Sequence, residues 1–425
     1  MHYLIVGNGV AGVSAALKLR EREQEAKIAL LSGESDYFFS RTALMYAYMD
    51  QMSLKDLEPY ERGKYKDLRI DLIKGWMSDL DAEARLVTLS DGRTIRYDKL
   101  LLATGSLARQ TDWPGLAQVK EGVVNFVTLQ DLGRCEALTP STREAVVVGG
   151  GLIGVELVEC LLHHGRKITF LVKDPWYWPV ALGGEEGEMI NQHIRNHGVD
   201  LRLNEQVTEV FAGEGGRIRG VRLASGAEVP CQMLGVAIGV TPQIEFLRRA
   251  KTPPALNRGI VVDEAFLTSL PDVYAAGDCA EITLAETKPF VEQIWYSAKR
   301  HGMLAAQAML GDPIHYQKPL FFNSAKFFEI EYTTVGQVND APQDAEHFFW
   351  KHPHKEASIR LVTRNGALIG ANLLGARWDH TVFERWVREH RSRAFVLAHL
   401  REAQFDFEFG RLDLRPLYEK ELVHG

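Results

Sequence analysis

The feature that most constrains this chain is a glycine-rich loop that follows an apolar strand and opens a helix, and it occurs twice. The first copy runs from the stretch 2–6 (HYLIV) into the loop 7–12 (GNGVAG). The second runs from 145–148 (AVVV) into the loop 149–154 (GGGLIG). A helix with an apolar stripe and a second strand follow each loop, which is the order of a βαβ unit. Two copies at a domain-scale distance indicate a duplicated unit and not a solenoid.

Each loop has the spacing Gly-x-Gly-x-x-Gly, which suits a pyrophosphate. The first glycine allows a tight turn, the second lets phosphate approach the backbone, and the third lets helix and strand pack closely. The helix N-terminus adds free N–H groups and the positive end of its dipole. We therefore predict one dinucleotide at each loop. The predicted contacts are Gly7, Gly9, Val10, Ala11 and Gly12 in the first loop and Gly149, Gly151, Leu152, Ile153 and Gly154 in the second.

An acidic residue about 20 residues beyond such a loop commonly binds the ribose. In the first unit the candidate is Glu34, with Ser32 second, and an ordinary loop carboxylate is the alternative. In the second unit Lys173 would face a 2′-phosphate and Asp174 a 2′-hydroxyl, unless both are solvated turn charges. The sequence leaves the choice between NADH and NADPH open.

Composition and charge exclude several classes of protein. The 425 residues exceed what one core usually supports, so two or three domains are expected. The net charge of −7 and the absence of a Lys/Arg tract argue against nucleic-acid binding. The start of the chain lacks the pattern of a signal peptide, and no apolar run approaches the ~18 residues of a membrane span. We expect a cytoplasmic protein without a membrane span.

The four cysteines, at positions 135, 160, 231 and 279, form no closely spaced pair. This spacing argues against a zinc site, an iron–sulfur site or a local redox disulfide. We expect buried apolar cysteines and no metal.

Together with three further segments, the two loops resemble the FAD-dependent pyridine nucleotide oxidoreductases, the glutathione-reductase-like superfamily with two dinucleotide domains. Residues 97–106 (YDKLLLATGS) are similar to the turn segment beside the flavin, and residues 235–242 (GVAIGVTP) to its nicotinamide counterpart. Residues 270–278 (LPDVYAAGD) are similar to the second FAD fingerprint. The resemblance covers about residues 1–320. It implies FAD contacts at Ala103, Thr104, Gly105, Gly277 and Asp278, and a nicotinamide-dinucleotide contact at Gly239.

The same resemblance assigns roles near the two rings. Glu156 matches a glutamate that lies near the nicotinamide, which makes it the catalytic candidate; a carboxylate favoured by the helix dipole is the alternative. Residues 292–302 match the helix whose N-terminus faces the flavin pyrimidine edge. Such a helix end stabilises negative charge on the reduced flavin. Trp295 and Trp76 are further predicted FAD contacts.

The segment 37–44 (YFFSRTAL) indicates the subgroup. Disulfide reductases of this superfamily carry two cysteines here, and coenzyme A-disulfide reductases and NADH oxidases carry one; this chain has no cysteine before Cys135. The segment is more similar to rubredoxin reductases and to the FAD part of NADH-dependent nitrite reductases. That similarity implies FAD contacts at Ser40 and Arg41, with a surface role for Arg41 as the alternative.

The expected fold class is α/β, with two Rossmann-like dinucleotide-binding domains, each followed by a small antiparallel element, and a C-terminal α+β domain. The predicted domains are FAD-binding at 1–113 and 243–320, NAD(P)H-binding at 114–242, and a C-terminal interface domain at 321–425. A helical tail is expected over 379–400. The aromatics of the tail from residue 377 form either core and subunit contacts or a docking surface for an electron carrier. Residues 176–178 (WYW) either cover the adenine or pack in the core.

The resemblance implies an FAD-dependent NAD(P)H oxidoreductase, in which NAD(P)H passes a hydride to flavin N5 and electrons then leave to an acceptor. The missing cysteine and the segment 37–44 favour a rubredoxin- or ferredoxin-type carrier protein as acceptor. The alternatives are a direct reductase of a small molecule, a quinone or oxygen, and a flavin-bearing redox sensor or scaffold. We also expect a homodimer.

Overall fold

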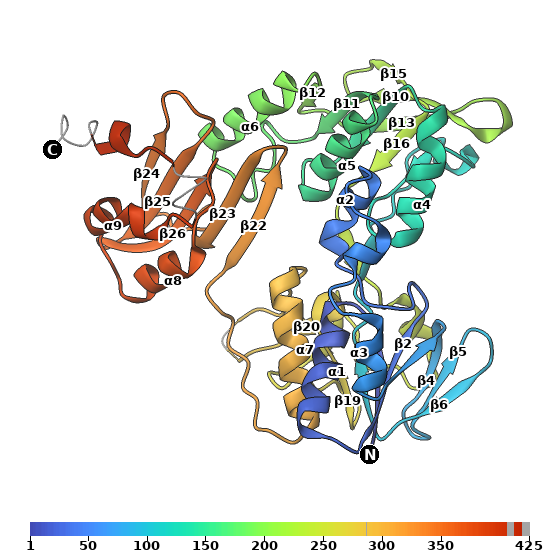
Figure 1. Ribbon diagram of the computed structural model, residues 1–425. Coiled ribbons are helices and arrows are strands. Elements are labelled where there is room, and N and C mark those ends of the chain that lie inside the picture. The colour runs from blue at the N-terminus through green and yellow to red at the C-terminus, as the bar shows by residue number, and fades with distance from the viewer. Residues whose placement is uncertain (286, 406–411, 419–425) are drawn as a thin grey trace. The chain divides into compact units, whose positions relative to one another are not determined.

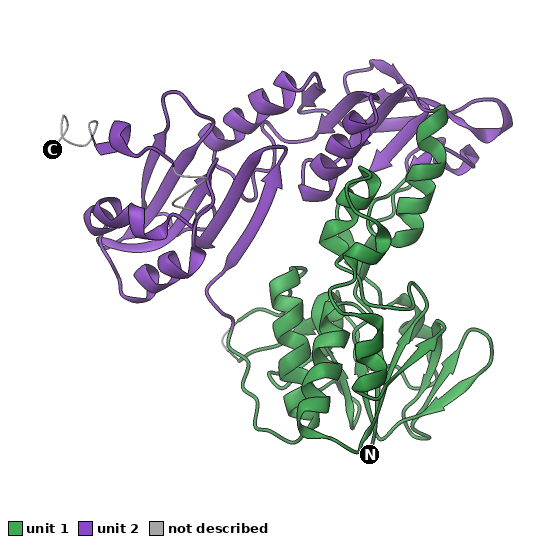
Figure 2. Cartoon of the chain, in the orientation of Figure 1, with its two compact units in different colours: residues 1–112, 124–141, 237–317 green, residues 113–123, 142–236, 318–425 purple. Residues whose placement is uncertain are grey.

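The computed structural model describes residues 1–285, 287–405 and 412–418. It divides into two compact units (Figure 2). Unit 1 comprises residues 1–112, 124–141 and 237–317, and unit 2 comprises residues 113–123, 142–236 and 318–425. Unit 1 thus holds nearly all of both pieces of the predicted FAD domain. Unit 2 holds most of the predicted nicotinamide domain and the C-terminal region. The finer division into three domains stays a prediction.

Unit 1 is built on a five-stranded parallel sheet in the order β19-β7-β1-β2-β3 (Figure 1). Nearly every residue of β1 is buried, as expected for a central parallel strand that is covered on both faces. The strands are β1 (His2–Val6), β2 (Lys27–Ser32), β3 (Ile70–Lys74), β7 (Lys99–Leu102) and β19 (Val273–Ala275).

Two long helices of unit 1 pack against each other, α1 (Val10–Arg22) and α7 (Trp295–Met309) (Figure 1). Their contact brings segments from the two ends of the unit's sequence together. The shorter helices are α2 (Leu44–Tyr48), α3 (Arg62–Asp67) and α4 (Leu129–Leu138). The 3-10 helices are η1 (Arg41–Ala43), η2 (Leu54–Leu57), η4 (Thr139–Ser141), η6 (Glu245–Arg249) and η7 (Gly277–Cys279).

Three small sheets complete unit 1. One is an antiparallel sheet in the order β4-β5-β6, which contains the predicted hairpin. Another pairs β8 with β17, and the third has the order β18-β20-β21. Their strands are β4 (Met77–Asp81), β5 (Leu86–Leu89), β6 (Thr94–Arg96), β8 (Ser106–Ala108), β17 (Val240–Pro242), β18 (Ile260–Val262), β20 (Ala280–Ile282) and β21 (Phe290–Val291).

Unit 2 repeats this plan with a parallel sheet in the order β12-β11-β10-β16 and an antiparallel sheet in the order β13-β14-β15. The two-residue strand β9 (Val123–Val124) falls where the chain passes between the units. The other elements are β10 (Glu144–Val148), β11 (Lys167–Val172), β12 (Asp200–Leu203), β13 (Val207–Ala212), β14 (Ile218–Leu223), β15 (Glu228–Pro230), β16 (Met233–Val236), α5 (Leu152–His163), α6 (Gly184–Asn196), η3 (Leu116–Gln118) and η5 (Glu214–Gly216).

The C-terminal part of unit 2 is an antiparallel sheet in the order β22-β23-β26-β25-β24, and α8 packs on β23 and β26 (Figure 1). Its strands are β22 (Phe322–Phe327), β23 (Ile330–Gly336), β24 (Glu346–Lys351), β25 (Ser358–Arg364) and β26 (Ala367–Leu374). The helices are α8 (His380–Arg388), α9 (Arg393–His399) and η8 (Leu400–Ala403). The α/β fold class with two repeated dinucleotide-binding units is therefore confirmed.

The aromatic tail contributes to the core of the C-terminal sheet. Trp378, Phe383 and Trp386 are buried there, which supports the packing interpretation for these three side chains. Phe405 is exposed. Phe395 is partly buried against the same core, and positions 407 and 409 lie outside the described residues. Within the part of the chain that the structure describes, no helix has both the length and the apolar character needed to cross a bilayer.

Candidate dinucleotide sites

The first loop has the geometry that its glycine spacing predicts. Gly7 has a φ of +110°, and a Cβ there would lie 2.1 Å from the carbonyl oxygen of Ala103. A Cβ at Gly12 would lie 1.9 Å from the carbonyl oxygen of Gly7. A Cβ at Gly9, in contrast, would meet nothing within 4 Å. The middle glycine therefore borders open space at the start of α1, where a pyrophosphate would approach.

Helix α1 begins directly after this open space. Its N-cap is Gly9, and no side chain caps the helix, so the first N–H groups face outward without a side-chain acceptor. Val10 and Ala11 are the first helical residues. Free N–H groups and the positive end of the dipole form an anion site, which fits the phosphates of FAD.

The second loop reproduces these features. Gly149 has a φ of +123°, and a Cβ at Gly154 would lie 2.0 Å from the carbonyl oxygen of Gly149. A Cβ at Gly151 would meet nothing within 4 Å, and Gly151 is the N-cap of α5 without a side-chain cap. Leu152 and Ile153 open this helix. Unit 2 thus carries its own anion site at the carboxyl end of β10.

Around the first loop, the predicted second FAD segment supplies a partly buried carboxylate. Asp278 accepts a hydrogen bond of 2.7 Å from the hydroxyl of Ser106. Burial raises the pKa of Asp278, while the Ser106 hydrogen bond and the charge of Arg41 act in the opposite direction. The preceding Gly277 has a φ of +78° and packs against Ala11 of α1. Ser106 lies within a segment that the sequence singled out, but we did not predict it as a site residue.

The turn at Ala103–Gly105 is held by two hydrogen bonds to the backbone of Gln243. Thr104 donates its hydroxyl to the carbonyl oxygen of Gln243 at 2.9 Å, and the N–H of Gln243 donates to Gly105 at 2.9 Å. Strand β17 pairs with β8 just beyond. Gly239 therefore belongs to unit 1, where its carbonyl accepts from the N–H of Arg109. The structure groups this predicted nicotinamide contact with the FAD segments and not with the second loop.

Trp295 begins α7, and no side chain caps that helix. Its indole Nε1 is buried and has no hydrogen-bond partner within the described residues. A buried donor without a partner is costly unless a ligand accepts from it. The open Gly9 position, the partly buried Asp278 and this indole N–H all fit a bound FAD.

Two predicted FAD contacts bind each other. The guanidinium of Arg41 forms a bidentate ion pair with Glu34, at 2.9 and 2.6 Å, and Leu129 donates its N–H to the same carboxylate at 3.1 Å. Arg41 also donates to the carbonyl oxygen of Val127. Glu34 therefore already has several donors, so a ribose hydroxyl would share this carboxylate with Arg41.

Two of the other predicted FAD contacts, Ser32 and Trp76, lie at the end of β2, and Ser40 lies further along the chain. Ser32 is the last residue of β2, and its hydroxyl accepts from the N–H of Ser35 at 3.4 Å. The ring of Trp76 covers Gly33, since a Cβ at Gly33 would lie 2.1 Å from it. Ser40 precedes η1, and its hydroxyl contacts that of Thr42 at 3.2 Å.

In unit 2, Glu156 lies on the second turn of α5 and is partly buried. Burial and the neighbouring Glu159 raise the pKa of Glu156 to about 8. The site can therefore hold a proton on this side chain at neutral pH. Lys173 is exposed directly after β11, and Asp174 beside it is partly buried.

The aromatic run 176–178 packs in the core of unit 2. Tyr177 is fully buried against Phe170 and Phe327, and Trp178 packs on Tyr332. These contacts favour the packing interpretation for Tyr177 and Trp178 over a cover for the adenine.

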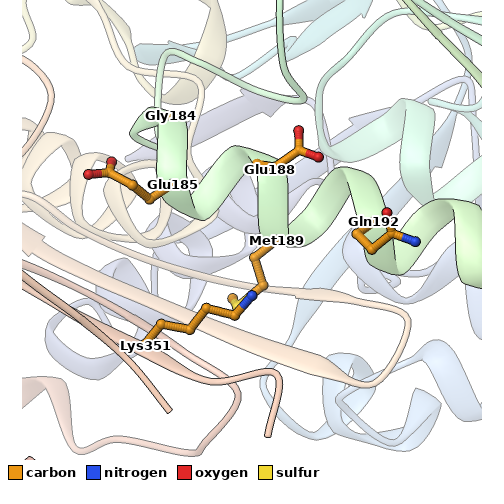
Figure 3. A pocket seen from close by; sticks show the side chains of 6 residues that line it. All are labelled: Gly184, Glu185, Glu188, Met189, Gln192 and Lys351. Atoms are coloured by element: carbon orange, nitrogen blue, oxygen red, sulfur yellow. The ribbon is translucent and has the colours of Figure 1, made fainter. Parts of the chain in front are cut away.

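A pocket on unit 2 lies outside the predicted cofactor positions. Lys351 of β24 extends toward α6 in Figure 3. The pocket is lined by Gly184, Glu185, Glu188, Met189, Gln192 and Lys351, which include no predicted cofactor contact. We assign no role to this pocket.

The four cysteines, all among the described residues, are free and buried. Burial raises the pKa of Cys231 to about 12 and also raises the pKa of Cys135 and Cys279. High thiol pKa values disfavour the thiolate that disulfide exchange requires. The expectation of buried cysteines is confirmed.

Two glycine-rich loops with the geometry of phosphate-binding loops, each at the carboxyl end of a parallel strand, are typical of a protein with two dinucleotide sites. Residues 1–309 match the family described as pyridine nucleotide-disulphide oxidoreductase. The chain is also 33% identical over 339 residues to the 5,5'-dehydrodivanillate O-demethylase ferredoxin reductase subunit of Sphingobium sp., which covers 78% of this chain and 81% of that relative. The chain belongs to the pyridine nucleotide-disulphide oxidoreductase family.

Two further comparisons extend this finding. The chain is 25% identical over 384 residues to the NAD(P)H nitrite reductase of Bacillus subtilis, which covers 88% of this chain and 45% of that relative. A crystal structure of a ferredoxin reductase from Rhodopseudomonas palustris has a TM-score of 0.82 and 25% identity, and covers 93% of this chain and 98% of that one. The predicted superfamily and subgroup are confirmed, and the protein is an FAD-dependent NAD(P)H oxidoreductase.

Proposed function

We propose that this oxidoreductase passes electrons from NAD(P)H to a small carrier protein of the ferredoxin or rubredoxin type. The observation that carries the proposal is the 33% identity, over 78% of this chain, to a ferredoxin reductase subunit. The similarity to a ferredoxin reductase from Rhodopseudomonas palustris supports it.

The arrangement of cysteines also supports a carrier as the acceptor. No cysteine precedes Cys135, and all four are buried with no free thiol at the predicted flavin segment 37–44. Electrons would therefore leave without a thiol relay. A second redox protein that docks at the flavin meets this requirement.

The chain's own residues would bind and orient the two cofactors. FAD, when bound, supplies a ring that can accept a hydride from NAD(P)H and release electrons singly or in pairs. The N-terminus of α1 would bind its phosphates, and Asp278 would hydrogen-bond the adjoining chain. The N-terminus of α7 would favour negative charge on the ring through its dipole. In unit 2, the N-terminus of α5 would bind the phosphates of NAD(P)H, and Glu156 would hold a proton near the nicotinamide.

The proposal is tested with the purified yellow holoprotein under anaerobic conditions. NADH and NADPH are titrated separately, and the loss of flavin absorbance gives the preferred nucleotide. Candidate ferredoxins and rubredoxins are then added, with cytochrome c as the final reporter. We expect cytochrome c reduction to depend on the carrier concentration and to saturate. A rate that is independent of every carrier, with fast turnover on a quinone or oxygen, would instead identify a direct reductase.

The cytoplasmic location and the homodimer also belong to this proposal. A reductase that couples NAD(P)H to a reduced carrier works where both are kept reduced, which is the cytoplasm. Light scattering after size-exclusion chromatography gives the mass of the holoprotein. A mass near that of one 47.8 kDa chain would exclude a homodimer.

A further inference from the structure

Two histidines and a glutamate converge on one point of unit 2, away from both glycine loops in the sequence. His193 lies in the last turn of α6 and His197 is the C-cap of that helix, while Glu329 lies in the two-residue turn between β22 and β23. The Nε2 atom of His193 is 3.2 Å from a carboxylate oxygen of Glu329, and the Nε2 atom of His197 is 3.1 Å from the same oxygen. The three ligand atoms all lie within 4.8 Å of one another.

Second contacts determine which nitrogen of each imidazole carries a proton. The Nδ1 atom of His197 is 2.9 Å from the carbonyl oxygen of His193, and a carbonyl only accepts, so this Nδ1 donates. The Nδ1 atom of His193 is 2.6 Å from the carboxylate of Glu356, which also accepts. In the neutral form of each ring, Nε2 therefore carries the lone pair that can bind a cation.

Three electron-pair donors this close together repel unless a cation, either a proton or a metal ion, lies between them. Glu159 adds a further carboxylate near Glu329, and burial raises the pKa of Glu159 while the charge of Lys326 acts in the opposite direction. Phe328 stacks on His197, with ring centroids 4.2 Å apart, and contacts His193 edge-on, so both rings are held in place.

Two of the three separations between the ligand atoms fit a metal site. Two ligands at about 2.0–2.1 Å from zinc lie about 3.3 Å apart in a tetrahedral site and about 3.0 Å apart in an octahedral one. The observed separations of 3.2 and 3.1 Å from Glu329 fall in this range. Histidine that donates its other nitrogen to a carboxylate or carbonyl is the usual second-shell arrangement around zinc. The exposed side chain of Glu329 leaves the point open to solvent, from which an ion can enter.

We propose that His193, His197 and Glu329 bind a divalent transition-metal ion of the zinc class, with Glu356 positioning His193. Imidazole and carboxylate ligands suit such ions, and three protein ligands leave a fourth position for water. The ion would tie α6 to the turn between β22 and β23 and so fasten the C-terminal sheet to the helix. Its role is structural, since none of the ligands belongs to the predicted cofactor contacts.

The test uses tag-free holoprotein that has been treated with a chelator and dialysed. Zinc chloride is titrated calorimetrically, and the melting temperature is measured with and without zinc. We expect one zinc per chain and a higher melting temperature in its presence. The variants His197→Gln and Glu329→Gln should bind zinc at least about 100-fold more weakly and lose the temperature shift. Glu356→Gln should weaken binding by about 10–100-fold, as second-shell substitutions do.

A matched control is available in unit 1. His315 forms an exposed pair with Glu264, at 2.6 Å, outside the proposed site. His315→Gln should therefore bind zinc like the wild type. Flavin absorbance and circular dichroism verify that each variant is folded. Zinc binding that is absent from the wild type, or equal in all four variants, would overturn the proposal and leave an ion pair between protonated histidines and Glu329.

Discussion

Glu156 holds a proton at neutral pH, because burial and Glu159 raise its pKa to about 8. An unfolded glutamate titrates near pH 4.3. Between these values the folded protein binds a proton that the unfolded chain lacks, so the free energy of unfolding falls as the pH rises, by up to about 1.4 kcal/mol per pH unit. Glu156→Gln removes this pH-dependent contribution to the free energy of unfolding. We expect the stability of the variant relative to wild type to grow from pH 5 to pH 8, as measured by urea unfolding.

The control for this prediction is Glu136→Gln, which changes an exposed glutamate on α4. Its unfolding curves should follow the wild type at every pH. Parallel pH profiles for Glu156→Gln and wild type would contradict a raised pKa at Glu156.

A charge reversal at Lys173 tests whether this one residue determines the preference between NADPH and NADH. It is exposed directly after β11, where a 2′-phosphate would lie in the predicted pose. A charge-assisted contact to phosphate is strong, so Lys173→Glu should lower kcat/KM for NADPH by about 10-fold or more and change that for NADH much less. Stopped-flow reduction of the flavin with each nucleotide measures both values. Lys167→Glu, at the exposed start of β11, controls for the change in net charge, and equal effects of Lys173→Glu on both nucleotides would exclude this role.

Single residues also mark the limit of what the sequence predicts. Gly9 and Gly151 were found because their role follows from a local spacing. The ion pair between Glu34 and Arg41 was not predicted, because each residue was predicted separately as an FAD contact. The approach of Glu329 to His193 and His197 joins segments far apart in the chain, and no local pattern indicates it.

At the level of elements, the contact between α1 and α7 requires a glycine at its closest point. A Cβ at Gly302 of α7 would lie 2.0 Å from the carbonyl oxygen of Ala11. Backbone cannot yield as a flexible side chain does, so Gly302→Ala should force the helices apart and destabilise unit 1 by about 1–3 kcal/mol. Because Ala11 belongs to the first loop, the affinity for FAD should fall as well. Urea unfolding and flavin release measure the two effects.

Gly133→Ala on α4 is the matched control. It lies on a helix, as Gly302 does, but a Cβ there meets nothing within 4 Å. This substitution should stabilise the protein by up to about 1 kcal/mol, through helix propensity alone. Similar effects of the two substitutions would show that the helices have room to adjust.

Elements with local signals were predicted, and those that depend on distant contacts were not. The hairpin of β5 and β6 was visible from its turn residues, whereas the pairing of β8 with β17 joins segments that we had assigned to different cofactors. The helical tail expected over 379–400 is confirmed, although it is not one continuous helix. The chain forms α8 and α9, because His390 has a φ of +52° and Ser392 caps a new helix through Phe395.

For the whole molecule, the sequence predicted the duplicated plan because both copies carry the same strand, loop and helix signals. The C-terminal region had weaker signals, and several described residues of its tail belong to a core. Trp378, Phe383 and Trp386 are buried there, so deletion of the tail would unfold the C-terminal sheet. A deletion of the tail would therefore test folding and not the choice between a reductase and a redox scaffold.

The two loops should act in series, and matched substitutions separate them. A Cβ at Gly9 or Gly151 meets nothing within 4 Å, and both residues have extended backbone angles that valine adopts. Gly9→Val and Gly151→Val should therefore fold, each at a cost of no more than about 1–2 kcal/mol for a poorer N-cap. The added side chain fills the space that phosphate needs. Gly9→Val should be isolated colourless, with an affinity for FAD reduced by about 100-fold or more. Gly151→Val should be yellow and bleached by dithionite, yet stay oxidised with NADH or NADPH in an anaerobic cuvette. Reduction of Gly151→Val by either nucleotide at the wild-type rate would mean that the second loop does not bind the electron donor.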